Sequence, residues 1–284
     1  MKRLYSILLT FALVCALLMP GLGLADKARE YASGDYRYAL NADGTAVITK
    51  YLGSGDEAEV PGTLDGHPVT AIGDAAFYEC AGLTSITLPD GLQSIGDFAF
   101  DSCLNLYSLT LPSGLQSIGK YAFYMCDCLN TLTLPEGLKS IGEGAFDRCY
   151  FLESLTLPEG LLSIGTDAFF DTRLGAVTLP MSLREITGNP FSGSETWPVV
   201  PAGHPCFAMD QGVLFDKVSK TLVSFPYGDQ RTSYAVPEGI LRIGDKAFSG
   251  CYGLTSVTLP EGLKSIGEEG CNEGVGLTSL TLTE

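Results

Sequence analysis

Residues 83–103 read LTSITLPDGLQSIGDFAFDSC, and residues 106–126 repeat this phrase as LYSLTLPSGLQSIGKYAFYMC. A single unit of this kind cannot bury its own apolar side, whereas stacked units bury it against one another. The repeat therefore predicts a solenoid. The Ile-Gly pair inside the phrase returns at a spacing of 23 residues, at Ile72, Ile95, Ile118, Ile141 and Ile164, and again at Ile243 and Ile266. A Phe follows most of these anchors five residues later, at Phe77, Phe100, Phe123, Phe146, Phe169 and Phe248.

Each unit combines the pattern of a β-strand with the pattern of a turn. Apolar and polar residues alternate in LTSITL, so we expect this strand of successive units to pair in a parallel sheet on one face. The Pro after each strand has no backbone N–H to donate to a neighbouring strand, so it marks the end of the strand. The Asp-x-Ala-Phe segment predicts a short helical or 3₁₀ turn on the other face, with caps at Asp74, Asp97 and Asp245. The expected fold class is an α/β solenoid.

The strand pattern also carries a family resemblance. Residues 83–88 and 106–111 fit the leucine-rich repeat signature L-x-x-L-x-L, with Ile86 at one of its positions. The full unit, LxxLxLPxGLxSIG with IGxxAFxxC, resembles the BspA-like subclass of that family over nearly all of 60–284. The resemblance implies a right-handed coil in an exported or cell-surface protein, commonly bacterial, that adheres to host matrix proteins or other cells. Gly91 and Gly114 stand where other leucine-rich repeats carry a stacking Asn, so Gly and the preceding Pro must hold that turn.

The first 25 residues have the pattern of a secretory signal peptide. Lys2 and Arg3 precede an apolar run, Leu4–Met19, and small residues follow with a predicted cleavage after Ala25. Cleavage leaves 15 basic and 33 acidic residues, a net charge of −18 (15 − 33). Such a surface repels nucleic acid and anionic lipid. No later stretch resembles a membrane span or a Leu-Pro-x-Thr-Gly sorting signal, so we expect a soluble protein that is secreted or held at the cell surface.

Changes in the pattern divide the mature chain into segments. Residues 26–35 are expected to be a flexible leader, and 36–71 an N-terminal cap with a β-hairpin that turns at Asp43-Gly44. Regular repeats are predicted over 72–186 and again over 243–284, which includes a degenerate C-terminal end. The irregular unit between them, 187–242, is predicted to contain a long loop at 192–206 and a hairpin at 212–226. Trp197 in that loop is interpreted either as a packing plug or as a binding contact.

No residue pattern in the chain indicates catalysis, a cofactor or a metal. Five cysteines share one column, Cys80, Cys103, Cys126, Cys149 and Cys251, and we favour reduced core thiols over disulfides between coils. The two histidines, His67 and His204, precede Pro and are interpreted as structural turn residues. Acids recur two residues after the anchor at Asp74, Asp97, Glu143, Asp245 and Glu268. They are interpreted as solvated caps, with weak calcium binding as the alternative.

The outward positions of the predicted strands are the candidate binding residues. Threonines recur there beside polar and aromatic neighbours, and the expected binding set is Thr87, Tyr107, Thr110, Asn130, Thr133, Glu153 and Thr156, with Trp197 in the loop. A β-branched ladder also stabilises an exposed sheet without any ligand. We therefore expect a non-catalytic extracellular recognition or adhesion module for a protein ligand, such as a host matrix or cell-surface protein. The alternatives are a passive spacer, or a glycan-binding protein or glycosidase that uses 187–211. An acid pair with an aromatic platform beside that loop would favour the glycan.

Overall fold

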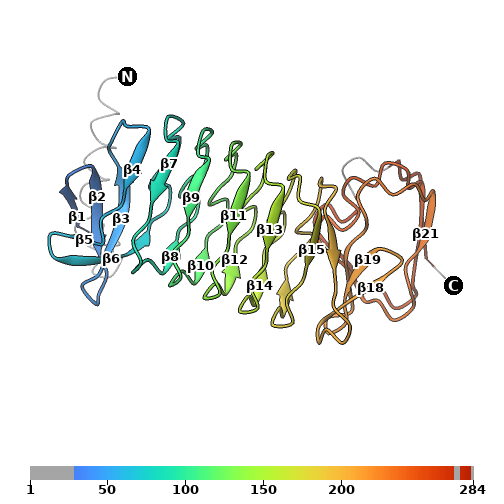
Figure 1. Cartoon of the computed structure of the whole chain (residues 1–284). Coiled ribbons are helices and arrows are strands. Elements are labelled where there is room, and N and C mark those ends of the chain that lie inside the picture. The colour runs from blue at the N-terminus through green and yellow to red at the C-terminus, as the bar shows by residue number, and fades with distance from the viewer. Residues whose placement is uncertain (1–28, 272–275, 283–284) are drawn as a thin grey trace, which may run out of the picture.

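The computed structural model describes residues 29–271 and 276–282, which form an elongated stack of coils (Figure 1). The predicted signal peptide, 1–25, lies outside the described residues. The described residues form strands and turns and contain no helix. The predicted solenoid of stacked coils with parallel strands is therefore confirmed, but the predicted α/β class is wrong.

The N-terminal end of the stack is covered by an antiparallel sheet. It contains β1 (Glu30–Ser33), β2 (Tyr36–Leu40) and β3 (Ala46–Tyr51). Strand β3 also pairs in parallel with β6 (His67–Ile72), and β5 (Thr63–Leu64) pairs antiparallel with β6. Residues 30–33 were expected in a flexible leader, but they pair with β2. The ring of Tyr51 stacks on Phe77 at a centroid distance of 5.0 Å, so the cap covers the apolar end of the core.

Each coil carries two short strands, so the stack has two parallel ladders where the sequence predicted one. The first ladder uses the L-x-x-L-x-L strands and comprises β4 (Glu57–Glu59), β7 (Ser85–Thr87), β9 (Ser108–Thr110), β11 (Thr131–Thr133), β13 (Ser154–Thr156), β15 (Ala176–Thr178) and β17 (Trp197–Val199). The second uses the Ser-Ile pairs and comprises β8 (Ser94–Ile95), β10 (Ser117–Ile118), β12 (Ser140–Ile141), β14 (Ser163–Ile164) and β16 (Glu185–Ile186). Ile118 pairs with Ile141, so one period of sequence advances the chain by one strand spacing.

The third side of each coil is a ribbon of reverse turns, where the sequence predicted a helical or 3₁₀ turn. In the first repeat, Ala75 and Glu79 have φ values of 54° and 57°, in the left-handed region, which interrupts any right-handed helix. The N–H of Phe77 donates to the carbonyl of Ala99 in the next coil at 2.8 Å, while the N–H of Tyr78 donates back to Ala75 at 3.2 Å. Some backbone N–H groups of the ribbon thus donate within its own turns and others donate to the neighbouring coil. In the interior of a helix, all of these groups donate within the helix.

The phenylalanine column forms a stack of rings through the centre of the core. Ring centroids are 5.0 Å apart for Phe77 and Phe100, 5.2 Å for Phe100 and Phe123, and 5.3 Å for Phe123 and Phe146. Each of these side chains is fully buried. Offset stacking of aromatic rings adds to the stabilisation that burial alone gives. Side chains that are 23 residues apart therefore lie in direct contact.

The Gly after each anchor Ile marks the closest approach of two coils. A Cβ atom on Gly119 would lie 2.5 Å from the carbonyl carbon of Gly96, and one on Gly142 would lie 2.6 Å from that of Gly119. No side chain fits against backbone at that distance. The Gly is required here because of the neighbouring coil, whatever the local turn conformation.

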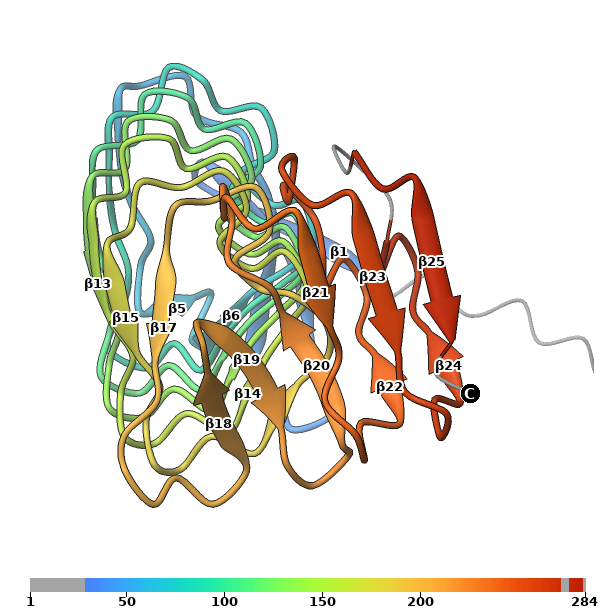
Figure 2. The ribbon, with the colours of Figure 1, turned by 90° about the vertical axis from the view of Figure 1, so that its right-hand side faces the viewer.

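The regular stack stops after β16 and β17, and a second stack begins beside it. The hairpin of β19 (Val213–Asp216) and β20 (Thr221–Ser224), with β18 (Phe207–Asp210) at its edge, leads into β22 (Arg242–Ile243) and β24 (Ser265–Ile266). The other ladder of this second stack contains β21 (Ser233–Ala235), β23 (Ser256–Leu259) and β25 (Ser279–Leu282). Viewed along the first stack, the second stack lies to one side of it (Figure 2).

The β19–β20 hairpin separates two apolar cores because successive side chains of a strand point to opposite faces. Leu214 and Val223 belong to the core of the first stack, whereas Phe215 and Leu222 belong to the core of the second. Polar contacts also join the stacks. The N–H of Asn189 donates to the carbonyl of Asp245 at 2.9 Å, and Lys246 Nζ lies 2.7 Å from Asp167 Oδ2.

The cysteine column lies inside the wall of the stack. All eight cysteines of the described residues are free thiols, and Cys103, Cys126 and Cys149 are fully buried. The thiol of Cys126 donates to the carbonyl of Phe100 at 3.2 Å, and Cys103 does the same to Phe77. Burial raises the pKa of Cys103 to about 12, and it raises the pKa of Cys126 well above its ordinary value. These thiols fill small apolar sites and are poor nucleophiles.

We expect Gly142→Ala to lower the free energy of unfolding by about 1–3 kcal/mol, because the added methyl must push two backbone segments apart. Gly82→Ala is the matched control, since no other atom would lie within 4 Å of the added Cβ atom. Urea unfolding followed by circular dichroism measures both variants. Equal stability of the two would contradict the close approach of coils.

Alkylation of the native protein should label Cys128, which is only partly buried, far faster than its neighbour Cys126, which is fully buried. Peptide mass spectrometry before and after unfolding distinguishes the two sites. Equal labelling rates in the native protein, or a disulfide that contains Cys126, would show that the column is not made of buried thiols.

Candidate functional site

The strand face consists of the outward side chains of β7, β9, β11 and β13. Burial along β11 and β13 follows the alternation of a strand, with Leu132 and Leu155 buried and the flanking hydroxyl residues exposed. The candidate binding residues are exposed on or beside these strands, namely Thr87, Tyr107, Thr110, Asn130, Thr133, Glu153 and Thr156. Tyr107, the aromatic residue among these seven, is 57% exposed.

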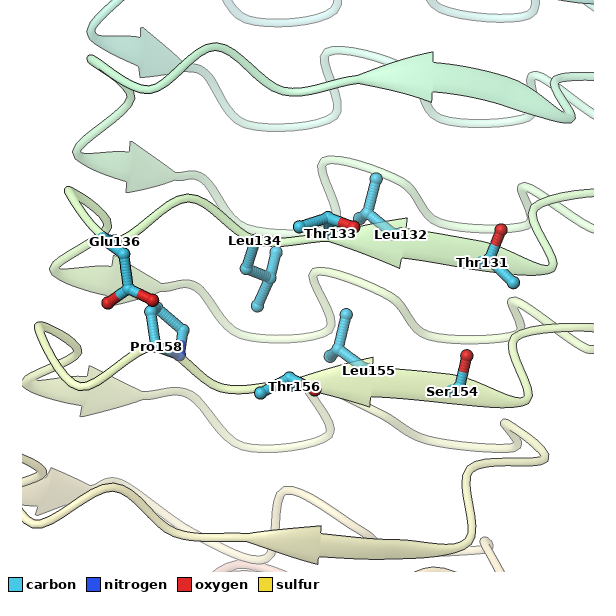
Figure 3. A pocket seen from close by; sticks show the side chains of 9 residues that line it. All are labelled: Thr131, Leu132, Thr133, Leu134, Glu136, Ser154, Leu155, Thr156 and Pro158. Carbon is cyan, nitrogen blue, oxygen red and sulfur yellow. The ribbon is translucent and has the colours of Figure 1, made fainter.

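Two shallow hollows lie on the strand face. One of about 250 Å³ is lined by Thr131, Thr133, Ser154 and Thr156, and Glu136 and Pro158 stand at its end (Figure 3). A second of about 420 Å³ lies over β9 and β11 and shares Thr131, Thr133 and Glu136 with the first. Together they make one depression that crosses three coils and is lined mainly by hydroxyl and short apolar groups.

The ladder beneath this depression is interrupted. Strands β4, β7 and β9 form one sheet and β11 and β13 form another, so β9 and β11 are neighbours without a regular strand pairing. The second ladder continues without interruption from β8 to β16. The coils therefore stay stacked although the first ladder has no regular strand pairing between β9 and β11, or between β13 and β15. The unpaired step between β9 and β11 lies at the larger of the two hollows.

Acidic side chains surround the strand face. Glu57 and Glu59 flank it on β4, Glu153 directly precedes β13, and Glu136 and Glu159 follow the strands, all of them exposed. The chain as a whole is strongly acidic, with 33 acidic and 17 basic residues. The face consequently carries a negative potential that attracts basic partners and repels acidic ones.

Trp197 is 65% exposed, so the interpretation of this residue as a packing plug is wrong. It begins β17, and it pairs with Ala176 of β15. The prediction of a continuous loop over 192–206 is also wrong at this strand. Pro198 made a strand improbable from sequence, but β17 is the edge of a two-stranded sheet, where a missing N–H costs little.

A third hollow, the junction hollow, lies where the first stack meets the second. It has a volume of about 530 Å³, and its polar and aromatic walls include Asp171, Arg173, Glu195, Trp197 and Tyr227. Of these residues, sequence reasoning singled out only Trp197. The alternation in Ser-Glu-Thr-Trp at 194–197 was the signal that could have predicted a strand with Glu195 and Trp197 on one face. Nothing local in the sequence places Tyr227 beside them.

The histidines and the acid column have structural roles. Nδ1 of His67 lies 2.8 Å from the carbonyl of Gly44, and the buried ring of His204 accepts the N–H of Phe207 at 3.1 Å. Burial lowers the pKa of His204. Asp74 Oδ1 accepts the backbone N–H of Asp97 in the next coil at 2.9 Å. Asp97 and Asp245 accept the backbone N–H groups of Lys120 and Glu268 in the same way, so these three aspartates cap the next coil and not a helix.

Within the described residues, no group of three or more His, Cys, Asp or Glu side chains is placed to hold a metal ion. The described residues also include no helix that could cross a lipid bilayer.

A solenoid whose coils carry L-x-x-L-x-L strands and bury their leucines in columns is a leucine-rich repeat protein. A family model described as the BspA type leucine rich repeat region matches residues 70–197 and 223–284 in six copies. The chain belongs to that family. The unmatched residues between these ranges include β18 and β19, which form the insertion between the two stacks.

Solved structures of bacterial leucine-rich repeat proteins share the fold. A leucine rich cell surface protein from Faecalibacterium prausnitzii is 29% identical with a TM-score of 0.65, over 90% of this chain and 77% of that one. The leucine rich repeat protein of T. pallidum is 26% identical with a TM-score of 0.53, over 84% and 86%. The pneumococcal vaccine antigen PcpA, 23% identical with a TM-score of 0.69 over 89% and 70%, has the same fold. No curated protein matches the chain.

The partly buried Asp147 makes stability depend on pH. Burial raises the pKa of Asp147 to about 7, and its Oδ1 atom has no hydrogen-bond partner. Arg148 and Lys246 oppose this rise, whereas Asp167 and Asp171 add to it. The ordinary value is 3.8, so the folded state holds the proton more tightly than the unfolded state. The resulting stabilisation is complete below pH 3.8 and is lost as the pH rises through about 7.

Asp147→Asn removes this ionisation and keeps the shape of the side chain. We expect the variant to melt about 2–4 °C above the wild type at pH 8, the shift that about 1 kcal/mol gives in a chain of this size. At pH 4 the difference should shrink, because the wild-type carboxyl is then protonated in the folded state. Melting curves at both pH values check this, with the exposed Asp90→Asn as control. A gain of the same size at both pH values would show that ionisation is not the cause.

Proposed function

We propose that the protein is an extracellular recognition or adhesion module without catalytic activity, and that it binds a protein partner along the strand face. The observation that carries the proposal is the depression across β9, β11 and β13, which is lined by exposed hydroxyl groups. Tyr107, which directly precedes β9, adds an exposed aromatic ring to the same face. Hydroxyl groups donate and accept hydrogen bonds, and an exposed aromatic ring supplies contact area at low entropic cost. This combination suits an extended polypeptide.

The construction of the face also supports binding. Stacked coils hold it in one conformation, so little conformational entropy is lost when a partner binds. Thr133 and Thr156 are exposed neighbours on paired strands, and both line the hollow (Figure 3). A passive spacer needs neither a hollow nor an exposed Tyr107. The ladder's contribution to sheet stability is compatible with binding, because only its outward atoms would contact a partner.

The acidic rim indicates the charge of the partner. Glu57, Glu59, Glu136 and Glu153 favour an extended segment rich in Lys or Arg, such as those on matrix or cell-surface proteins. The sequence pattern of residues 1–25 supports export. The name of the Faecalibacterium prausnitzii protein, a leucine rich cell surface protein, supports a location at the cell surface or outside the cell.

The test is a binding screen of the mature chain against purified extracellular matrix proteins at low and physiological salt. Tyr107→Ala and Thr133→Arg should each weaken binding about tenfold or more, the first by removing contact area and the second by filling the hollow with a positive charge. Binding should also weaken as salt increases, because the rim charges are screened.

Val218→Arg is the matched control, since Val218 is 73% exposed on the turn between β19 and β20 and lies off the strand face. If Val218→Arg weakens binding as much as Thr133→Arg does, the strand face is not the site. If no matrix protein binds the wild-type chain, the passive spacer is the better account.

A further inference from the structure

We propose that the junction hollow is a second binding site, which holds one neutral sugar ring of a glycan against the indole of Trp197. This site is separate from the strand face, and the inference goes beyond the protein-binding function proposed above. It rests on how the structure holds Trp197, on the polar groups opposite it, and on the charge of the surroundings.

The exposure of Trp197 is imposed by two buried hydrogen bonds in the residues that directly precede it. Ser194 and Thr196 are buried, whereas Glu195 and Trp197 between and after them are exposed. Ser194 Oγ donates to the carbonyl of Thr172 at 2.9 Å, and Thr196 Oγ1 donates to that of Leu174 at 2.7 Å. Both bonds fasten this segment to the preceding coil. Turning Trp197 inward would therefore leave buried hydroxyl groups without partners.

The rest of the hollow is held as firmly as Trp197. The guanidinium carbon of Arg173 lies 5.3 Å from the ring centroid of Phe151, which orients the guanidinium group. Tyr227 lies against Gly250, where a Cβ atom would be only 2.2 Å from its ring, and it contacts Tyr252 edge to face. Gly250 has a φ of 73°, so the ribbon of the second stack leaves room for the Tyr227 ring. The site is preorganised from both stacks.

The chemistry of these walls matches a pyranose. Such a ring has an apolar C–H face, which packs on an indole, and a rim of hydroxyl groups, each of which donates and accepts hydrogen bonds. Asp171 and Glu195 supply acceptors and Arg173 supplies donors, and the Tyr227 hydroxyl, which is hydrogen-bonded to Tyr252, adds a further polar group. The volume of about 530 Å³ falls within the roughly 300–1,000 Å³ of small-molecule sites. A hollow of this size and polarity suits a short saccharide better than a protein surface.

The charges select a neutral sugar. Two carboxylates face one guanidinium in the hollow, and the mature chain has a net charge of −18 (15 − 33). Sialylated, sulfated and uronic acid glycans would meet repulsion from both the site and the whole molecule. Neutral hexose or N-acetylhexosamine chains would not.

Trp197 is the single tryptophan of the chain, so its fluorescence reports on this site alone. The mature protein is titrated with cellohexaose, mannohexaose, maltohexaose and chitohexaose to about 1 mM, which corresponds to weak single-site binding. At least one of these neutral chains should shift the emission to shorter wavelength and protect it from acrylamide. The acidic chains oligogalacturonate and sialyllactose should do neither.

Calorimetry with the best neutral chain then compares variants. Trp197→Ala should weaken binding at least about tenfold, and Asp171→Asn combined with Glu195→Gln should weaken it severalfold by removing charged acceptors. All three positions are at least partly exposed, and melting curves confirm that the variants fold. Tyr107→Ala is the matched control, an exposed aromatic on the strand face, and it should bind the sugar as the wild type does.

Three results would overturn the inference. They are the absence of any emission change or heat with all four neutral chains, binding that survives in Trp197→Ala, and tighter binding of the acidic chains. Each result is independent of the matrix-protein screen, because that screen depends on the strand face and the Tyr107→Ala variant separates the two sites.

Discussion

The close approach of successive coils is the constraint on which the rest of this structure depends. At the Ile-Gly pairs, backbone lies so near backbone that a methyl group on Gly119 or Gly142 would collide with the coil before it. This contact sets the spacing between coils, and the spacing brings the rings of the phenylalanine column to about 5 Å from one another. Cysteine thiols and turn-ribbon amides reach the neighbouring coil for the same reason.

The first stack ends where the regular repeat is interrupted. The hairpin of β19 and β20 places Leu214 in one core and Phe215 in the next, so a single element terminates one stack and begins another. Asn189 and Lys246 fasten the two stacks together, and the junction hollow lies at the resulting corner. An insertion that interrupts the repeat thereby creates a hollow lined by unlike charged and aromatic groups, whereas the hollows of the regular coils are lined by repeated hydroxyl groups.

The two candidate surfaces have complementary properties. The strand face is long and shallow, and its contacts would come from many equivalent hydroxyl groups. The junction hollow is a single hollow of about 530 Å³, and its contacts come from a few unlike groups that two stacks hold in place. A rigid solenoid can present both because the apolar columns that join its coils are buried, which leaves many outward side chains free to differ. Substitutions such as Thr133→Arg can therefore change recognition without unfolding the chain.

By itself, the sequence determined the period, the solenoid, the buried Ile, Leu, Phe and Cys columns and the exposed threonines, because each of these follows from spacing repeated many times over. Only the tertiary structure decided that the Ala-Phe segments are turn ribbons, since the left-handed conformations at Ala75 and Glu79 are stabilised by bonds to the next coil. It also decided that β17 is a strand, and that Tyr227 lies across from Trp197. Those contacts occur once, between segments without a repeated pattern, and depend on how two stacks meet.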